Sequence, residues 1–157
     1  NWKEDDLVEL FYKNGQLKER GTLKNGKEDG LWEMFYENGQ LWERGTFKNG
    51  KQDGLWELFY ENGQLEMKVT YKDGIEGLME TYHRNGQLKM RGNYEDGEIE
   101  GLSEMFDENG QLKMRGNVKG GKQHGVWEYF DQNGQIEYVL YYINGKSVKR
   151  KRYLRRK

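Results

Sequence analysis

Residues 30–53 read GLWEMFYENGQLWERGTFKNGKQD. This stretch contains two Asn-Gly pairs, Asn38-Gly39 and Asn49-Gly50, separated by a run in which apolar and polar residues alternate. Asn-Gly is a preferred sequence for tight β-hairpin turns because both residues tolerate a positive φ. Alternation with a period of two places successive side chains on opposite faces of a strand. The stretch therefore predicts antiparallel strands joined by short turns.

The same pattern recurs along the chain. Asn-Gly-Gln begins at residues 14, 38, 62, 85, 109 and 133, and a second turn signal lies between these positions at residues 25, 49, 73, 96, 120 and 144. Internal similarity at a fixed period is typical of repeat architectures. We therefore expect an all-β, elongated array of antiparallel β-hairpins, with six repeats of about 24 residues across residues 1–145.

Charge pairs across the hairpin indicate its register. If Asn38-Gly39 is a two-residue loop, Glu33 lies directly opposite Arg44, and four other repeats place opposite charges in the same relation. A three-residue loop would place Glu33 opposite Glu43, and like charges opposed across strands are unfavourable. We therefore expect two-residue loops at the Asn-Gly-Gln positions.

Aromatic residues supply much of the apolar area and leave two interpretations open, core or binding groove. The face that carries Trp32 is the more apolar and is the expected core, with the Trp32 ring covering the bare backbone of Gly45 opposite. Trp42 stands where other repeats have Lys or Glu and is a candidate exposed aromatic residue. The full set of candidate binding residues is Phe35, Trp42, Phe59, Trp32, Trp56, Tyr36 and Tyr60.

The repeats are not uniform. The linker Asp73–Gly77 is one residue shorter than its counterparts, and Met79 and Ser103 stand where other repeats have tryptophan. A one-residue slip would turn all later side chains to the wrong face, so we expect a local change of the backbone to absorb it. These departures predict two half-arrays with different surfaces.

Charge is unevenly distributed. The chain has 26 basic and 27 acidic residues, and residues 146–157 hold eight of the basic residues and no acidic one, which leaves about −9 for residues 1–145. We expect residues 146–157 to form a basic C-terminal tail or cap. Three interpretations stay open: a solvated segment, contact with anionic lipid or nucleic acid, and folding back on the acidic body.

The sequence offers little for catalysis or metal binding. It has no cysteine, its only histidines, His83 and His124, lie in different repeats, and its only serines are Ser103 and Ser147. A nucleophile-and-base constellation would have to be assembled from these few residues. The acidic turns lack the ligand density of a calcium loop. We therefore expect no enzymatic activity, cofactor, metal site or small-molecule substrate.

Cellular location is not indicated. No apolar run approaches the roughly 20 residues that span a bilayer. The chain begins at Asn1 and not at Met, so we expect that residues have been removed from its front. Both a cytoplasmic and an exported location stay open.

The repeat unit resembles the MORN repeat (membrane occupation and recognition nexus). The resemblance rests on GLWELFYENGQL at residues 54–65 and its counterparts, each followed by a half such as GTFKNG at residues 45–50. It covers residues 6 to about 145. The units are most similar to the bacterial variant found in YwqK-family antitoxin-type proteins.

This resemblance implies hairpin units in a single curved sheet, no catalytic activity, and binding of proteins or sometimes lipids. It carries over no functional residue. The expected function is a non-enzymatic scaffold that binds a partner protein, with an antitoxin that neutralises a cognate toxin as one form. The alternative is an envelope or surface binder of glycan, lipid or a host protein.

Overall fold

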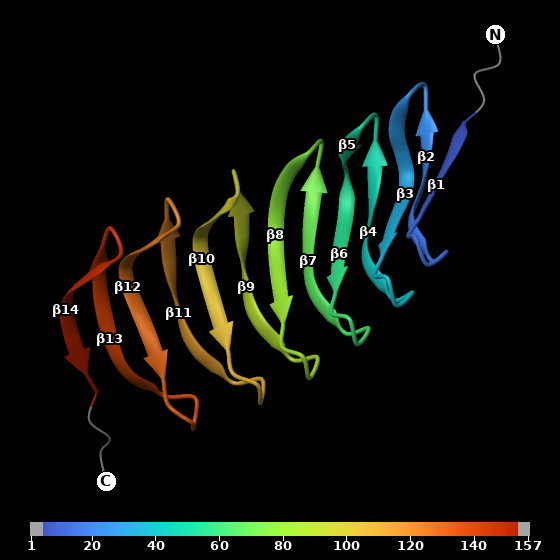
Figure 1. The fold of residues 1–157 in the computed structure, drawn as a ribbon. Helices are drawn as coiled ribbons and strands as arrows, with labels where there is room; N and C mark the ends of the chain where they lie inside the picture. The colour runs from blue at the N-terminus through green and yellow to red at the C-terminus, as the bar shows by residue number, and fades with distance from the viewer. Residues whose placement is uncertain (1–4, 154–157) are drawn as a thin grey trace. The chain divides into compact units, whose positions relative to one another are not determined.

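The computed structural model describes residues 5–153, and all regular structure in them is β-strand (Figure 1). No helix long and apolar enough to cross a membrane occurs in this part of the chain. The chain divides into two compact units, residues 1–77 and residues 78–157. The division falls directly after the short linker Asp73–Gly77, where the irregular spacing predicts a change between half-arrays.

Unit 1 is an antiparallel meander. Its strands are β1 (Asp6–Phe11), β2 (Leu17–Lys24), β3 (Lys27–Phe35), β4 (Leu41–Lys48), β5 (Lys51–Gln52), β6 (Gly54–Phe59) and β7 (Leu65–Lys72). They pair in the order β1-β2-β3-β4-β6-β7. The short β5 pairs with β4 alone.

Unit 2 continues the same architecture. Its strands are β8 (Ile75–Tyr82), within which the division falls, β9 (Leu88–Glu95), β10 (Glu98–Phe106), β11 (Leu112–Lys119), β12 (Lys122–Phe130), β13 (Ile136–Ile143) and β14 (Lys146–Arg152). Consecutive strands of this unit pair antiparallel from β8 to β14. The all-β class and the antiparallel hairpins expected from the sequence are confirmed.

The second series of turns has the expected geometry. Asn25 and Gly26 have φ values of 53° and 75°, and both central residues of the other five turns in the series also have positive φ. Two consecutive residues with positive φ define the type I′ turn, whose twist matches that of the flanking strands. Asn-Gly, Asp-Gly and Gly-Gly at these positions are therefore required by the turn.

The Asn-Gly-Gln turns differ from the sequence prediction. The Tyr36 amide donates to the Gln40 carbonyl at 2.8 Å and the Gly39 amide donates to the Tyr36 carbonyl at 2.9 Å, so Glu37, Asn38 and Gly39 form a three-residue loop. Only Gly39 has a positive φ, of 88°. This is the common hairpin loop in which a turn is followed by a left-handed glycine. The expected two-residue loop is wrong.

The charge register is nevertheless as expected, with Glu33 opposite Arg44. A β-bulge makes this possible, because the register shifts between Met34, which faces Glu43, and Phe35, which faces Leu41. Trp42 is the extra residue in β4. A bulge adds one residue to one strand, and it therefore offsets the longer loop. The loop and the bulge together keep the like charges of Glu33 and Glu43 from opposing each other.

A second irregularity lies at the start of the long strands. Arg20 faces Glu33 while Thr22 faces Asp29, so β3 carries two more residues than β2 between these pairs. Gly30, in this interval, has a φ of 75°, whereas Gly77 of the short linker lacks a positive φ. Beyond Gly77 the usual register holds, with Glu80 opposite Arg91. The short linker is therefore absorbed locally, as expected.

The core of each unit is a column of side chains at equivalent positions of its repeats. Trp32 and Trp56 in unit 1, and Met79, Ser103 and Trp127 in unit 2, are all buried. A Cβ added to Gly45 would lie 2.2 Å from the Trp56 ring, and one added to Gly21 would lie 2.2 Å from the Trp32 ring. Each ring therefore lies on the glycine of the preceding strand. The expectation that the Trp32 ring covers Gly45 is wrong, because the ring lies on Gly21. Trp32 and Gly45 are nevertheless opposite each other across β3 and β4.

Residues 146–152, the first part of the expected basic tail or cap, form β14 and pair with β13. The Arg150 guanidinium lies over the Tyr138 ring, 4.6 Å from its centroid. The side chains of β14 are exposed, so this strand covers the edge of β13 mainly through its backbone. Residues 154–157 lie outside the described residues.

Replacement of Trp56 by alanine should destabilise the protein by about 3–5 kcal/mol, because the ring is 3% exposed and its Nε1 donates to the Thr46 carbonyl at 3.2 Å. Urea unfolding followed by circular dichroism measures the loss. Trp42→Ala is the matched control, since Trp42 is 39% exposed and should lose about 1 kcal/mol or less. Equal losses in the two variants would contradict the assignment of Trp56 to the core.

A chain shortened to residues 1–145 should self-associate, because the loss of β14 leaves the backbone of β13 unpaired along Tyr138–Ile143. Sedimentation velocity measures the association. A chain shortened to residues 1–153 retains β14 and should sediment as the full chain does. The prediction is wrong if both shortened chains sediment alike.

Candidate binding surface

In each unit, a row of ion pairs runs along the sheet face opposite the core column. In unit 1, Arg44 Nε lies 2.9 Å from Glu57 Oε1, and Arg20 Nη2 lies 2.7 Å from Glu33 Oε1. In unit 2, Arg91 pairs with Glu104 and Arg115 with Glu128. Each arginine thus bonds to the glutamate of the following strand. Arg44 lies opposite Glu33, as the sequence predicts, but its ion pair forms with Glu57.

Aromatic rings explain the direction in which the arginines turn. The Arg44 guanidinium lies 5.5 Å from the centroid of the Phe59 ring, and Phe59 follows Glu57 by two residues on the same strand. Cations are attracted to the faces of aromatic rings. Equivalent contacts join Arg20 to Phe35, Arg91 to Phe106 and Arg115 to Phe130. The glutamate and the phenylalanine together hold each arginine toward the next strand.

Apolar side chains beside this charged row remain exposed. Leu31 is 54% exposed and Leu55 is 47% exposed, each two residues before a paired glutamate and on the same face. We define the leucine row of unit 1 as Leu7, Leu31 and Leu55, and the leucine row of unit 2 as Leu78, Leu102 and Val126. The sequence analysis missed these residues as candidates. The alternation of side chains along a strand could have identified them, because each residue directly precedes a core position and so lies on the face away from the tryptophans.

The aromatic candidates have different environments. Trp32 and Trp56 are buried in the core column and offer no surface. The Tyr36 hydroxyl donates to the Phe59 carbonyl at 2.6 Å and so joins adjacent hairpins. Burial raises the pKa of Tyr36. Phe35, Phe59 and Tyr60 are half-buried.

Trp42 is the most exposed of the aromatic candidates. Its ring is tilted against that of Tyr36, with 6.0 Å between the ring centroids. Trp42 owes its position to the bulge in β4, which the sequence analysis did not foresee. The structure therefore separates Trp42 from the buried tryptophans, with which it shares only its residue type.

Of the residues considered for catalysis and metal binding, His83 makes a structural contact. His83 Nε2 lies 2.9 Å from the Phe106 carbonyl, so His83 occupies the structural role that Tyr36 has in unit 1. His124 faces Asn117 across β11 and β12. Within residues 5–153, no three His, Cys, Asp or Glu side chains are grouped in a way that could hold a metal ion.

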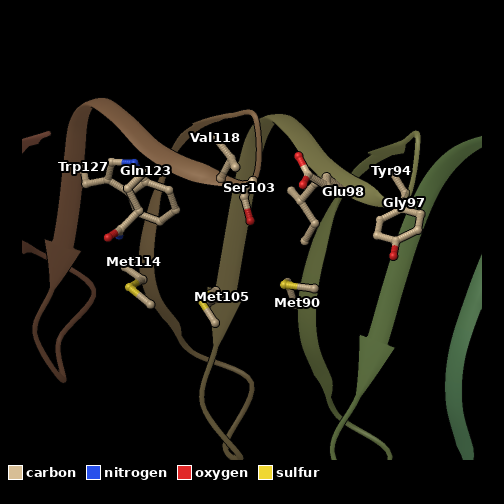
Figure 2. Close-up of a pocket in the computed structure, with 12 residues that line it drawn as sticks. Met90, Tyr94, Gly97, Glu98, Ser103, Met105, Met114, Val118, Gln123 and Trp127 are labelled. Atoms are coloured by element: carbon tan, nitrogen blue, oxygen red, sulfur yellow. The ribbon is translucent and has the colours of Figure 1, made fainter. Parts of the chain in front are cut away.

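Unit 2 contains a hollow of about 610 Å³ beside Ser103 (Figure 2). The hollow is lined by Met90, Met105 and Met114, and Figure 2 shows Tyr94 and Trp127 at its two ends. Ser103 is 3% exposed and occupies the place of a tryptophan in the core column. The hollow therefore lies on the core face, away from the leucine row.

Comparison with solved structures finds the crystal structure of accessory secretory protein 1, 2 and 3 in Streptococcus pneumoniae, at 19% sequence identity. The match covers 82% of this chain but only 19% of that chain, with a TM-score of 0.23. A comparison with curated proteins finds no match.

A family model gives the decisive result. The model described as "MORN repeat variant" matches residues 7–25, 28–49, 52–73, 75–96, 99–119 and 123–144. These six segments cover most of the chain, and each contains one Asn-Gly-Gln turn. The match agrees with the paired hairpins, the recurring turns and the core column described above. The chain therefore belongs to the family of MORN repeat variant proteins.

Proposed function

We propose that this chain is a non-enzymatic scaffold that binds a partner protein through its leucine row. The observation that carries the proposal is the exposure of Leu31 and Leu55 at equivalent positions of neighbouring hairpins. Two strand spacings separate such positions, or roughly 10 Å. Aligned apolar side chains on an exposed face are typical of surfaces that bind another protein.

The charged row beside the leucine row suits the rim of such an interface. The Arg44 side chain of the ion pair with Glu57 is 45% exposed, and an ion pair that solvent reaches contributes little to stability by itself. Charges at the edge of an interface select the partner and its orientation. The apolar row would thus supply contact area, and the paired charges would supply specificity.

An antitoxin that neutralises a cognate toxin is the more specific form of this proposal, and its support is the resemblance of the repeat to YwqK-family proteins. The alternative function is an envelope or surface binder of glycan, lipid or a host protein. The exposed cations of β14 favour an anionic lipid within that alternative. The two functions place the contact on different parts of the chain.

Leu55→Asp should weaken binding of the partner at least tenfold, because a charge would enter the apolar contact. The partner is first captured from the source organism with the full chain, and its affinity is then measured by titration. Leu10→Asp is the matched control. Leu10 is 49% exposed in the same unit and lies directly before a bulge, but its side chain is on the sheet face opposite that of Leu55. Equal affinities of the two variants would contradict the proposed surface.

The antitoxin form has its own test. Expression of the captured partner alone should arrest the growth of a bacterial host, and co-expression of this chain should restore growth. Co-expression of the Leu55→Asp variant should restore it poorly. A partner that is harmless when expressed alone would exclude the antitoxin form and leave the scaffold proposal in place.

Vesicle binding tests the alternative. If the full chain captures no protein in stoichiometric amount but binds anionic vesicles, and reversal of the β14 charges abolishes that binding, the alternative function is correct and the leucine row is not the binding surface.

A further inference from the structure

The six Asn-Gly-Gln loops share one backbone geometry but hold their asparagines differently. In every loop the glycine has a positive φ, and its amide donates to the carbonyl three residues before it. The asparagine is exposed in all six loops. What differs is the hydrogen bonding of the asparagine side chain.

Asn85 is held at both polar atoms of its side chain. Its Oδ1 accepts a hydrogen bond from the Gln87 backbone amide at 3.0 Å, and its Nδ2 donates to the Glu108 carbonyl of the next repeat at 2.7 Å. Asn14 makes the same two contacts with its own neighbours. Within residues 5–153, the first contact alone is made by Asn38 and Asn62.

An aspartate replaces this arrangement in the last two loops. Asp107 stands where unit 1 has a tyrosine, and its Oδ1 accepts the backbone amides of Asn109 at 2.9 Å and Gln111 at 3.0 Å. The amide that the asparagine binds in the other loops is therefore bound by Asp107. Asp131 makes the same two contacts in the sixth loop. Within residues 5–153, the side chains of Asn109 and Asn133 are left without a hydrogen-bond partner.

Asparagine is a thermolabile residue, and an unrestrained asparagine before glycine is open to deamidation. The Gly110 backbone nitrogen forms a bond to Cγ of Asn109, the Cγ–Nδ2 bond breaks, and Nδ2 leaves as ammonia with the proton of the Gly110 amide. Water then opens the cyclic imide, at Cγ to give aspartate or at the main-chain carbonyl to give isoaspartate. Glycine allows the approach because it has no Cβ. Water is the only co-reactant, and nothing is oxidised or reduced.

We propose that Asn109 and Asn133 are modification sites, at which the folded chain deamidates to aspartate and isoaspartate ahead of the other four loops. The reaction requires the side chain to turn until its Cγ reaches the glycine nitrogen. Asn85 must first break two hydrogen bonds, whereas Asn109 breaks none. The glycine amide must leave the same kind of hydrogen bond in every loop, so that cost does not distinguish the loops.

Isoaspartate lengthens the main chain of a loop whose length is matched to its strands. The register shift between Met105 and Phe106 offsets the three-residue loop that follows, and an additional main-chain carbon disturbs this match. The new carboxylate also lies beside Asp107 and Glu108, and like charges repel each other. The modified chain should therefore melt at a lower temperature than the fresh chain.

Peptide mapping by mass spectrometry measures the reaction at each loop. The full chain is incubated at neutral pH, and methylation by an isoaspartyl methyltransferase identifies the isoaspartate product. We expect Asn109 and Asn133 to react about tenfold faster than Asn85, which corresponds to about 1.4 kcal/mol. A difference of this size is on the scale of one or two neutral hydrogen bonds in water. Asn38 and Asn62 should react at rates between these two.

The chain unfolded in urea is the control for sequence, because all six loops have the same Asn-Gly-Gln sequence and should there react at equal rates. Asp107→Tyr introduces the residue of unit 1 and returns the Gln111 amide to the asparagine. It should slow Asn109 to the rate of Asn38 and leave Asn133 unchanged. Asp107→Asn removes the charge but keeps an Oδ1 acceptor, so Asn109 should stay fast, and this variant also serves if the tyrosine variant fails to fold.

Several results would overturn the inference. Equal rates at all six loops of the folded chain would do so, as would the same order of rates in urea. A slow Asn109 in the Asp107→Asn variant would assign the rate to the charge of Asp107 and not to the unheld side chain. A modified chain that melts at the same temperature as the fresh chain would contradict the effect on the loop.

Discussion

The contact between an indole ring and a bare glycine backbone is the interaction on which each unit depends. A unit made only of consecutive strands must bury its apolar area with its own side chains. Trp56 achieves this by lying flat on Gly45, where any side chain would collide with the ring. Trp56 also packs edge to face with Phe47, with 5.1 Å between the centroids. A glycine in a strand, normally a weakness, is here the surface on which the core is built.

Register follows from the same requirement. A tryptophan reaches the glycine of the preceding strand only if every hairpin presents the same face, and a slip by one residue would expose the ring. The chain meets this condition with paired irregularities. The bulge at Trp42 offsets the three-residue loop, and the glycine at position 30 takes up the extra length of β3. The Asn38 Oδ1 atom supports the loop, because it accepts a hydrogen bond from the Gln40 backbone amide at 2.9 Å.

The opposite face is free to serve binding because the core does not depend on it. Its ion pairs link adjacent strands, and its leucine row is left in solvent. The core face also varies, since Ser103 stands where other repeats have a ring and is one of the residues that line a hollow in unit 2. Repeat proteins tolerate such changes because each repeat depends mainly on its neighbours. One array can therefore carry two different surfaces.

The sequence by itself determined the repeats, the antiparallel hairpins, the type I′ turns and the opposition of Glu33 and Arg44. These features follow from local turn chemistry and a period of two, which sequence records directly. It did not determine the three-residue loop, because that loop and its bulge change the register in opposite senses and leave the charge pairs unaltered.

Only the tertiary structure decided which neighbour each side chain contacts. Trp32 has a glycine on both sides and lies on Gly21, and Arg44 has a glutamate on both sides and bonds to Glu57. The two choices are equivalent in sequence, and the packing of the ring and the position of Phe59 distinguish them. The hollow at Ser103 likewise required coordinates. A small residue in the column shows that a ring is absent, but whether its neighbours close the space depends on how their side chains pack.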